Sequence, residues 1–279
     1  MIETTNLTKY FGSLGAVQSV CFTVGKGEVF GLLGPNGAGK TTTIRMLTTL
    51  LSPTSGTASV AGYDILSEPL SVKRSIGVVP QMLNLDIDLT SAENLEYHGR
   101  LHTMPPADRK ARIEELLKFV GLWEKKGTPV EHLSGGMRRR LLIARGLMHR
   151  PAVVFMDEPT VGLDPQARRL IWGLIDELKR SGITILLTTH YIEEAEALCD
   201  RVAIMRQGKI IALDTPAALK QSVGKFSLEC IGNHEVPRKF FRTREEAIDA
   251  GRAVGCDLLV RESTLEDVFI SLTGERIEG

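Results

Sequence analysis

A glycine-rich segment between an apolar run and a helical pattern constrains this chain more than any other feature. Residues 28–33 (EVFGLL) form an apolar run of strand length. The residues that follow, from Gly34 to Thr41, read Gly-Pro-Asn-Gly-Ala-Gly-Lys-Thr, and a helical pattern begins directly after them. The segment therefore fits the P-loop pattern, which needs a strand before the loop and a helix behind it.

This loop predicts a phosphate-binding site. Its glycines let backbone N–H groups face phosphate oxygens, and the helix that begins near Gly39 adds its positive dipole end. We expect Lys40 to reach the β and γ phosphates and the Thr41 hydroxyl to ligate Mg²⁺. A tight glycine turn without a ligand is the alternative. The predicted nucleotide-binding residues of the loop are Gly34, Pro35, Asn36, Gly37, Ala38, Gly39, Lys40, Thr41 and Thr42.

Two carboxylates follow a second apolar strand. Residues 153–156 (VVFM) lead directly into Asp157 and Glu158, where a parallel strand delivers its C-terminal end to a ligand crevice. We expect Asp157 to hold Mg²⁺, directly or through water, and Glu158 to polarise an attacking water as general base. A helix-capping or salt-bridge role is the alternative for such a pair.

A second anion site is predicted about a hundred residues after the first. Ser134 can cap the helix that follows it, and Gly135 and Gly136 leave the first N–H groups of that helix uncovered. Its alternative interpretation is an ordinary serine N-cap.

The remaining pattern indicates an α/β fold. Further apolar runs of strand length alternate with helical patterns, which favours a largely parallel sheet with crossover helices. Residues 84–150 are helical throughout and predict a helical insertion. The runs lie at 76–79, 152–156, 183–189 and 202–205.

The tail predicts a small α+β appendage. A short helix opens at Thr215-Pro216, and the last helix is expected to begin at Ser263 with Glu266 completing a capping box. Between them lie strand candidates at 226–231 and 257–261 and a helix at about 243–254.

Composition limits the partners. The 34 Lys and Arg balance the 34 Asp and Glu, so the net charge is zero and no broad basic face for nucleic acid is expected. The cysteines lie far apart in the sequence and none falls into a Cys-x-x-Cys pair, so no zinc site is expected; they are Cys21, Cys199, Cys230 and Cys256. Neither a secretory signal nor a membrane span is found, so we expect a cytosolic protein whose membrane role depends on a partner.

Three further motifs complete a family pattern. Gln81 follows the strand IGVVP, Gly162-Leu-Asp164-Pro follows the acidic pair, and His190 ends the strand ITILLTTH. Together with the P-loop and LSGG, in this order, they resemble the ATP-binding cassette (ABC) ATPases over residues 1 to about 215. The resemblance implies a P-loop NTPase core with a largely parallel sheet, an N-terminal antiparallel β region and a helical subdomain at about 84–150. Residues 216–279 would form an accessory or regulatory domain.

The family also implies a head-to-tail homodimer. ATP is clamped between the P-loop of one subunit and the LSGG segment, here Ser134 to Gly136, of the other. Gln81 would contact Mg²⁺ or the water, Asp164 would lie at the dimer seam, and His190 would contact the γ-phosphate. For His190, a strand-end histidine that only hydrogen-bonds is the alternative.

An aromatic side chain is expected to stack on adenine. The family places it just before Gly12, so Phe11 is the first choice and Tyr10 the second. A core position is the alternative for an aromatic residue in an N-terminal strand.

The run LSGGMRRRL and the tail STLEDVFISLTG resemble the drug-resistance exporter branch, as in daunorubicin-resistance ATPases. Met137 stands where the family usually has Gln. Arg138, Arg139 and Arg140 are predicted to form a solvated, dimer-contacting or membrane-facing surface.

The resemblance implies an ATPase subunit of a membrane exporter. It would lie at the cytoplasmic face of the membrane and act on separate integral-membrane permease subunits. An importer, a soluble ABC ATPase acting on a macromolecular partner and a binding-only module are the alternatives. The set of Lys40, Asp157, Glu158 and His190 disfavours the last of these.

Overall fold

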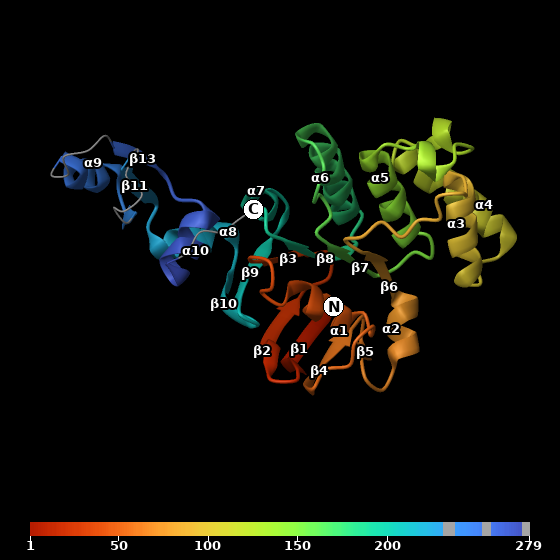
Figure 1. Cartoon of the computed structure of the whole chain (residues 1–279), viewed down its shortest axis with the longest axis horizontal. Coiled ribbons are helices and arrows are strands. Elements are labelled where there is room, and N and C mark those ends of the chain that lie inside the picture. The colour runs from red at the N-terminus through yellow and green to blue at the C-terminus, as the bar shows by residue number, and fades with distance from the viewer. Residues whose placement is uncertain (231–237, 253–257, 275–279) are drawn as a thin grey trace.

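A six-stranded sheet lies at the centre of the fold (Figure 1), and the computed structural model describes residues 1–230, 238–252 and 258–274. Its strand order is β10-β9-β3-β8-β7-β6. The strands from β9 to β6 are parallel, and β10 is antiparallel to β9, which confirms the expected largely parallel sheet. The strands are β3 (Val29–Leu33), β6 (Ile76–Val79), β7 (Val153–Asp157), β8 (Thr184–Thr189), β9 (Arg201–Arg206) and β10 (Lys209–Asp214).

Both faces of this sheet are buried, and alternate residues of each strand enter different cores. In β7, Val153 and Phe155 belong to one hydrophobic cluster, whereas Val154 and Met156 belong to the other. Side chains of a strand point alternately to its two faces, so a parallel sheet covered on both sides needs a continuous apolar run. This requirement explains the apolar runs of the sequence.

An antiparallel sheet and two helices cover the first face. The sheet has the strand order β2-β1-β4-β5, and its buried side chains share a core with β3, β7 and β8. The N-terminal antiparallel region implied by the resemblance is thereby confirmed. Its elements are β1 (Ile2–Phe11), β2 (Leu14–Val24), β4 (Ser55–Val60) and β5 (Tyr63–Asp64), with α1 (Lys40–Leu47) and α2 (Pro69–Ser75).

Helices cover the second face. Between β6 and β7 the chain forms the expected helical region, but its helices run only from Ser91 to Gly146, since residues 84–90 are not helical. Helices α3, α4 and α5 pack against one another. Figure 1 shows this group at one end of the molecule, beside α6. The helices are α3 (Ser91–Leu101), α4 (Pro106–Phe119), η1 (Trp123–Lys125), η2 (Val130–His132), α5 (Gly135–Gly146), α6 (Pro165–Arg180) and α7 (Ile192–Leu198). Within the described residues, none of the helices is both long enough and apolar enough to cross a membrane.

The tail contributes to the core and also extends from it. Leu219 of α8 and Phe269 of α10 are buried in the hydrophobic cluster on the second face of the sheet. In contrast, β11, β13 and α9 lie at the far end of the molecule in Figure 1. The tail elements are α8 (Pro216–Val223), β11 (Phe226–Cys230), β12 (Lys239–Phe241), α9 (Arg244–Arg252), β13 (Leu258–Glu262) and α10 (Leu265–Thr273). Of the positions predicted for this region, 231, 253, 254, 257 and Cys256 lie outside the described residues.

The predicted cap of the last helix was wrong by one residue. Thr264, not Ser263, is the N-cap, and the carboxylate of Asp267, not Glu266, accepts from the Thr264 amide at 2.8 Å. Glu266 instead lies 3.4 Å from Arg238. Both pairs have capping-box spacing, and the burial of Asp267 favours the second one.

Candidate functional site

The predicted loop lies between β3 and α1, and its glycines allow the backbone to approach closely. A Cβ atom on Gly34 would lie 2.3 Å from the Met205 carbonyl oxygen, and one on Gly39 would lie 2.4 Å from the Ala16 carbonyl oxygen. Gly39 also has φ of +103° and is the N-cap of α1. A side chain at either position would push the loop away from the sheet, so both glycines are required by the fold.

Lys40 places a buried cation inside this loop. Its Nζ atom donates to the carbonyl oxygens of Gly34 at 2.7 Å and Pro35 at 3.1 Å. The same atom lies 3.2 Å from Oε1 of Glu158, and both side chains are 5% exposed. The loop, the ammonium group and the carboxylate therefore form one connected cluster.

Thr41 and Asp157 supply two adjacent oxygen ligands. Oγ1 of Thr41 donates to Oδ1 of Asp157 at 3.0 Å, and Thr188 Oγ1 donates to the same oxygen at 2.6 Å. Adjacent oxygens around an octahedral Mg²⁺ are about 2.9 Å apart, since each lies about 2.05 Å from the ion. The donor set and its spacing therefore fit Mg²⁺.

Glu158 is held in an unusual backbone conformation. Its φ is +50°, in the left-handed region that only the surrounding structure can stabilise for a residue of this kind. The Glu158 amide donates to Thr188 Oγ1 at 3.0 Å. Nδ1 of His190 lies 2.6 Å from Oε2 of Glu158, although the two atoms are not aligned for a hydrogen bond. The carboxylate is thus fixed between Lys40 and His190.

Ser134 and Asp164 meet in a separate hollow of about 350 Å³. Oγ of Ser134 accepts from the Met137 amide at 3.3 Å, and Oδ1 of Asp164 accepts from the Ala167 amide at 2.9 Å. The N-termini of α5 and α6 therefore share this hollow, and Gly135 and Gly136 line it. Its lining residues do not include any residue of the P-loop cluster, so one chain keeps the two predicted anion sites apart.

Other predicted residues lie at the surface. Tyr10 and Phe11 are 44% and 50% exposed, which contradicts the alternative of a core position. Gln81 is also exposed. The loop residues divide by burial: Gly34 and Ala38 are buried, Pro35, Gly39, Thr41 and Thr42 are half-buried, and Asn36 and Gly37 are exposed.

Arg139 is a site residue that the sequence prediction placed wrongly. It was expected on a solvated surface, but it is 3% exposed. Burial lowers its pKa to about 10, against the raising effect of nearby carboxylates. Its guanidinium donates to five backbone carbonyl oxygens, at distances of 2.6 to 3.1 Å; they belong to Pro80, Gln81, Asp157, Glu158 and Pro159. Arg139 therefore joins α5 to the segments that carry Gln81 and Glu158.

The neighbouring arginines also bind backbone oxygens. Arg138 donates to the carbonyls of Val130 and Glu131, and Arg140 donates to that of Val120. The helical period does not identify Arg139 as the buried member, because each of the three arginines has buried residues of α5 at i+3 and i+4.

Known proteins with similar sequences are ATP-binding proteins of transporters. The model of the ABC transporter family matches residues 17–161. The Nod factor export ATP-binding protein I of Ralstonia nicotianae is 40% identical, over 99% of this chain and 95% of the relative. The linearmycin resistance ATP-binding protein LnrL of Bacillus subtilis is 44% identical, over 80% of this chain and 72% of the relative.

Solved structures of ATP-binding cassettes have the same fold as this chain. A dimeric post-hydrolysis state of the ATP-binding cassette MJ0796, bound to ADP and Pi, matches with a TM-score of 0.70 and 28% identity. The match covers 77% of this chain and 98% of MJ0796. The cbiO1 protein of Clostridium perfringens, part of the cbiONQ transporter complex, matches with a TM-score of 0.73 and 28% identity, over 78% of this chain and 89% of cbiO1.

Proposed function

This chain belongs to the ABC transporter family of ATP-binding proteins, and from this premise we propose that it is the ATP-hydrolysing subunit of a membrane exporter. The observation that carries the proposal is the Glu158 carboxylate, fixed between Lys40 and His190 beside the P-loop. Such a carboxylate can accept a proton from an attacking water. A protein that only stored ATP would not need this group.

Each residue of the cluster has a role in the proposed hydrolysis of ATP to ADP and phosphate. The loop amides and the Lys40 ammonium bind the β and γ phosphates, and His190 orients the γ-phosphate. Glu158 removes the proton of the water that attacks the γ-phosphorus. Thr41 and Asp157, with Gln81, would hold Mg²⁺, which neutralises charge that develops on the phosphate oxygens.

The proposed active unit is a head-to-tail homodimer. The α5 N-terminus at Ser134, Gly135 and Gly136 is a phosphate-binding element that lies in a different hollow from the P-loop of its own chain. Two facing copies would bring each such element to the ATP of the other, with Asp164 at the seam. The dimeric MJ0796 cassette supports a dimer as the active unit.

The adenine base is proposed to stack on Phe11, with Tyr10 as the second choice. Phe11 ends β1 with its ring half exposed. The β1–β2 hairpin also lies against the loop, because the carbonyl of Ala16 approaches Gly39. The Gln18 amide also donates to Gly208 at 2.7 Å, and the Gly208 amide donates to Ala38 of the loop at 3.0 Å. An aromatic face is thus available next to the phosphate site.

We propose that the chain lies at the cytoplasmic face of the membrane and powers separate permease subunits. The relatives are named for Nod factor export and linearmycin resistance, which supports export of a drug, a lipid or another hydrophobic compound. Residues 216–279 would serve as an accessory domain, with residues 1–215 as the nucleotide-binding domain. Deletion of the three-stranded tail sheet together with α9, with α8 and α10 retained, tests that role by its effect on dimerisation and turnover.

The direct test of hydrolysis is Glu158→Gln. This change keeps the size of the side chain and removes its ability to take a proton, so ATP binding should persist while turnover falls by at least about 100-fold. The ATP-locked dimer should accumulate in gel filtration. Glu177→Gln, an exposed change on α6, is the matched control and should keep native turnover. Native turnover in Glu158→Gln would show that another group acts as the base.

A further inference from the structure

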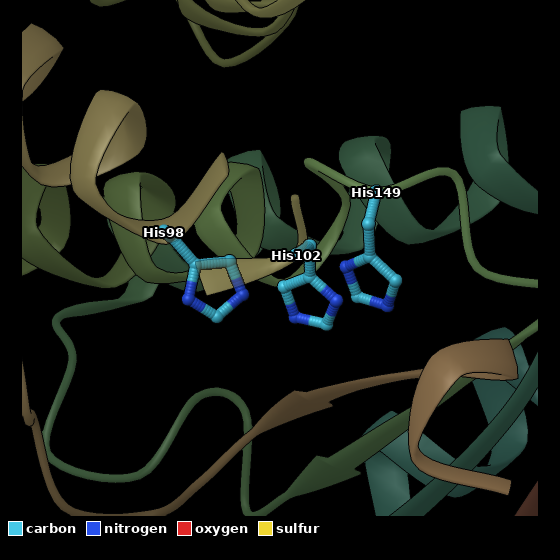
Figure 2. A group of neighbouring side chains, drawn as sticks. All are labelled: His98, His102 and His149. Atoms are coloured by element: carbon cyan, nitrogen blue, oxygen red, sulfur yellow. The ribbon is translucent and has the colours of Figure 1, made fainter. Parts of the chain in front are cut away.

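Three histidines from distant parts of the sequence gather outside the ATP site. His98 lies in the last turn of α3, His102 is its C-cap, and His149 lies in the connection between α5 and β7. Ring centroids of His98 and His102 are 4.8 Å apart, and those of His102 and His149 are 3.7 Å apart. Figure 2 shows the three rings in a row with His102 in the middle. One ligand nitrogen from each lies within 4.8 Å of the other two.

The backbone fixes the tautomer of His149. Its Nε2 atom lies 2.8 Å from the carbonyl oxygen of Ile76, which can only accept a hydrogen bond, so Nε2 carries the proton. Nδ1 is therefore left with a free lone pair. That atom is fully buried with no hydrogen-bond partner in the described residues, and Figure 2 shows a nitrogen of this ring facing His102. A ligating histidine characteristically donates its other N–H to a backbone carbonyl in this way.

Burial of the three rings favours the neutral imidazole, which is the form that binds a metal. Burial lowers the pKa of His98 to about 3 and that of His149 to about 4, and the repulsion that two protonated rings would experience adds to both effects. Burial lowers the pKa of His102 as well. At neutral pH, no proton has to leave before these nitrogens can donate to a cation.

We propose that His98, His102 and His149 form a binding site for Zn²⁺, with the fourth position open to water. Three imidazoles are a known ligand set for this ion, and each ligand nitrogen would lie about 2.0–2.1 Å from it. The sequence argument against a zinc site concerned cysteine pairs only. His98 and His102 have the i, i+4 spacing that places two side chains on one face of a helix, whereas the fold brings His149 to them from 47 residues beyond His102.

Binding requires a limited movement of the rings. His102 and His149 are stacked with an angle of 6° between their planes, and lone pairs that lie in nearly parallel planes do not meet at one ion. His102 therefore has to turn, and nitrogens up to 4.8 Å apart have to approach to about 3.4 Å, as tetrahedral ligands do. Two hollows, of about 690 and 430 Å³, are lined by His102 and His149 and give both room to turn and a path for the ion.

Positively charged side chains near the three histidines limit the affinity of the site for Zn²⁺. Arg145 lies close enough to His98, and Arg112 to His149, to disfavour a positive charge at these rings. The C-terminal end of α3, with its negative dipole, acts in the opposite direction. The bound ion would tie α3 to the connection after α5 and, through Ile76, to the start of β6. It would therefore restrict movement of the helical region relative to the sheet.

The test is a Co²⁺ titration of the full chain without an oligohistidine tag, nucleotide or Mg²⁺. One Co²⁺ per chain should produce the visible bands of a tetrahedral site, and Zn²⁺ should displace it. His98→Ala, His102→Ala and His149→Ala should each weaken binding at least about tenfold. His132→Ala, which removes an exposed histidine elsewhere on the helical region, is the matched control and should bind as the native chain does.

Weaker metal binding counts as loss of a ligand only if the variant is folded. Circular dichroism checks each variant, and His102→Ala carries the test if His149→Ala fails to fold, because His149 also holds the chain to β6. Zn²⁺ should raise the melting temperature of the native chain and not that of His102→Ala. Equal Co²⁺ binding by native chain and folded His102→Ala, or no binding by the native chain, would overturn the proposal. Neither result bears on ATP hydrolysis, which is measured separately.

Discussion

Replacement of Arg139 by Met tests whether a buried arginine positions the general base. Arg139 donates to five backbone carbonyls, and methionine fills a similar volume without any donor. Since the side chain contacts backbone atoms and no nucleotide-binding group, Arg139 acts as a positioning residue. We expect the variant to lose stability and turnover together.

The loss of stability can be worked out from the contacts. Three of the five hydrogen bonds, to Asp157, Glu158 and Pro159, are buried. An unsatisfied buried acceptor costs about 1–3 kcal/mol. Burial also lowers the Arg139 pKa to about 10, so the guanidinium is itself costly to bury, and its removal recovers part of the loss. We therefore take the low end of the range, about 3 kcal/mol in total. In a chain of this size that lowers the melting temperature by about 6–12 °C.

The catalytic effect should appear in kcat. Freed from Arg139, the backbone at Glu158 can relax from φ of +50°, and a misplacement of about 1 Å costs about 100-fold in rate. KM for ATP should change little, because the P-loop contacts of Lys40 do not involve Arg139. Calorimetry and steady-state phosphate release measure the two effects on the same preparation.

Arg138→Met is the matched control. Arg138 precedes Arg139 on α5 and donates to two carbonyls, those of Val130 and Glu131, in a half-buried setting. It should lose no more than about 1 kcal/mol and keep native kcat. The reasoning is refuted if Arg139→Met melts within about 2 °C of the native chain and retains its kcat, or if the two variants behave alike.

Four further predictions follow from other parts of the structure. Ser134→Arg should remove turnover while ATP affinity of the monomer, measured by calorimetry, stays nearly unchanged; loss of monomer binding would contradict the proposed dimer. Phe11→Ala should weaken ATP binding by about 5- to 150-fold, and a larger effect of Tyr10→Ala would reverse the order of the two. Phe269→Ala should cost about 3–5 kcal/mol in a thermal melt, since this side chain is 1% exposed. Burial raises the pKa of Asp267, but hydrogen bonds from Arg261 and the Thr264 amide outweigh burial, and the pKa is lower than the unfolded value of 3.8. The ionised carboxylate therefore stabilises the fold above pH 3.8, and this stabilisation is lost as the pH falls below that value. Asp267→Asn should abolish this part of the acid dependence of stability.

The parts of the fold that depend on local pattern could be predicted from the sequence. The run at 152–156 predicted β7 because a strand buried on both faces has to be apolar at every position. The Gly34–Thr41 segment predicted a loop between strand and helix because the glycine positions forbid side chains, as the close approaches at Gly34 and Gly39 show.

The parts of the fold and of the site that depend on long-range contacts could not be predicted from the sequence. Arg139 looked like one member of a basic run, and only the packing of α5 against β6 and β7 decides that its guanidinium points inward. Thr264 displaced Ser263 as the N-cap because Asp267 is buried beside Arg261 and Arg238, and Arg238, 2.9 Å away, comes from 29 residues earlier in the sequence. His98 and His102 have a helical i, i+4 spacing, but no local signal connects them to His149.

The position of Arg139 would also couple the two ATP sites of the proposed dimer. Along α5, Arg139 follows Ser134 by five residues, a rise of about 7.5 Å. In that dimer Ser134 faces the ATP of the partner, whereas Arg139 holds the backbone of Glu158 in its own chain. A shift of α5 on closure would therefore move both ends together, so ATP bound at one site would position the base of the other. We expect ATP turnover by the native protein to rise steeply with ATP concentration, with a Hill coefficient above 1, and Arg139→Gln to reduce that coefficient toward 1 while dimerisation persists. An unchanged coefficient would show that the coupling runs through other contacts.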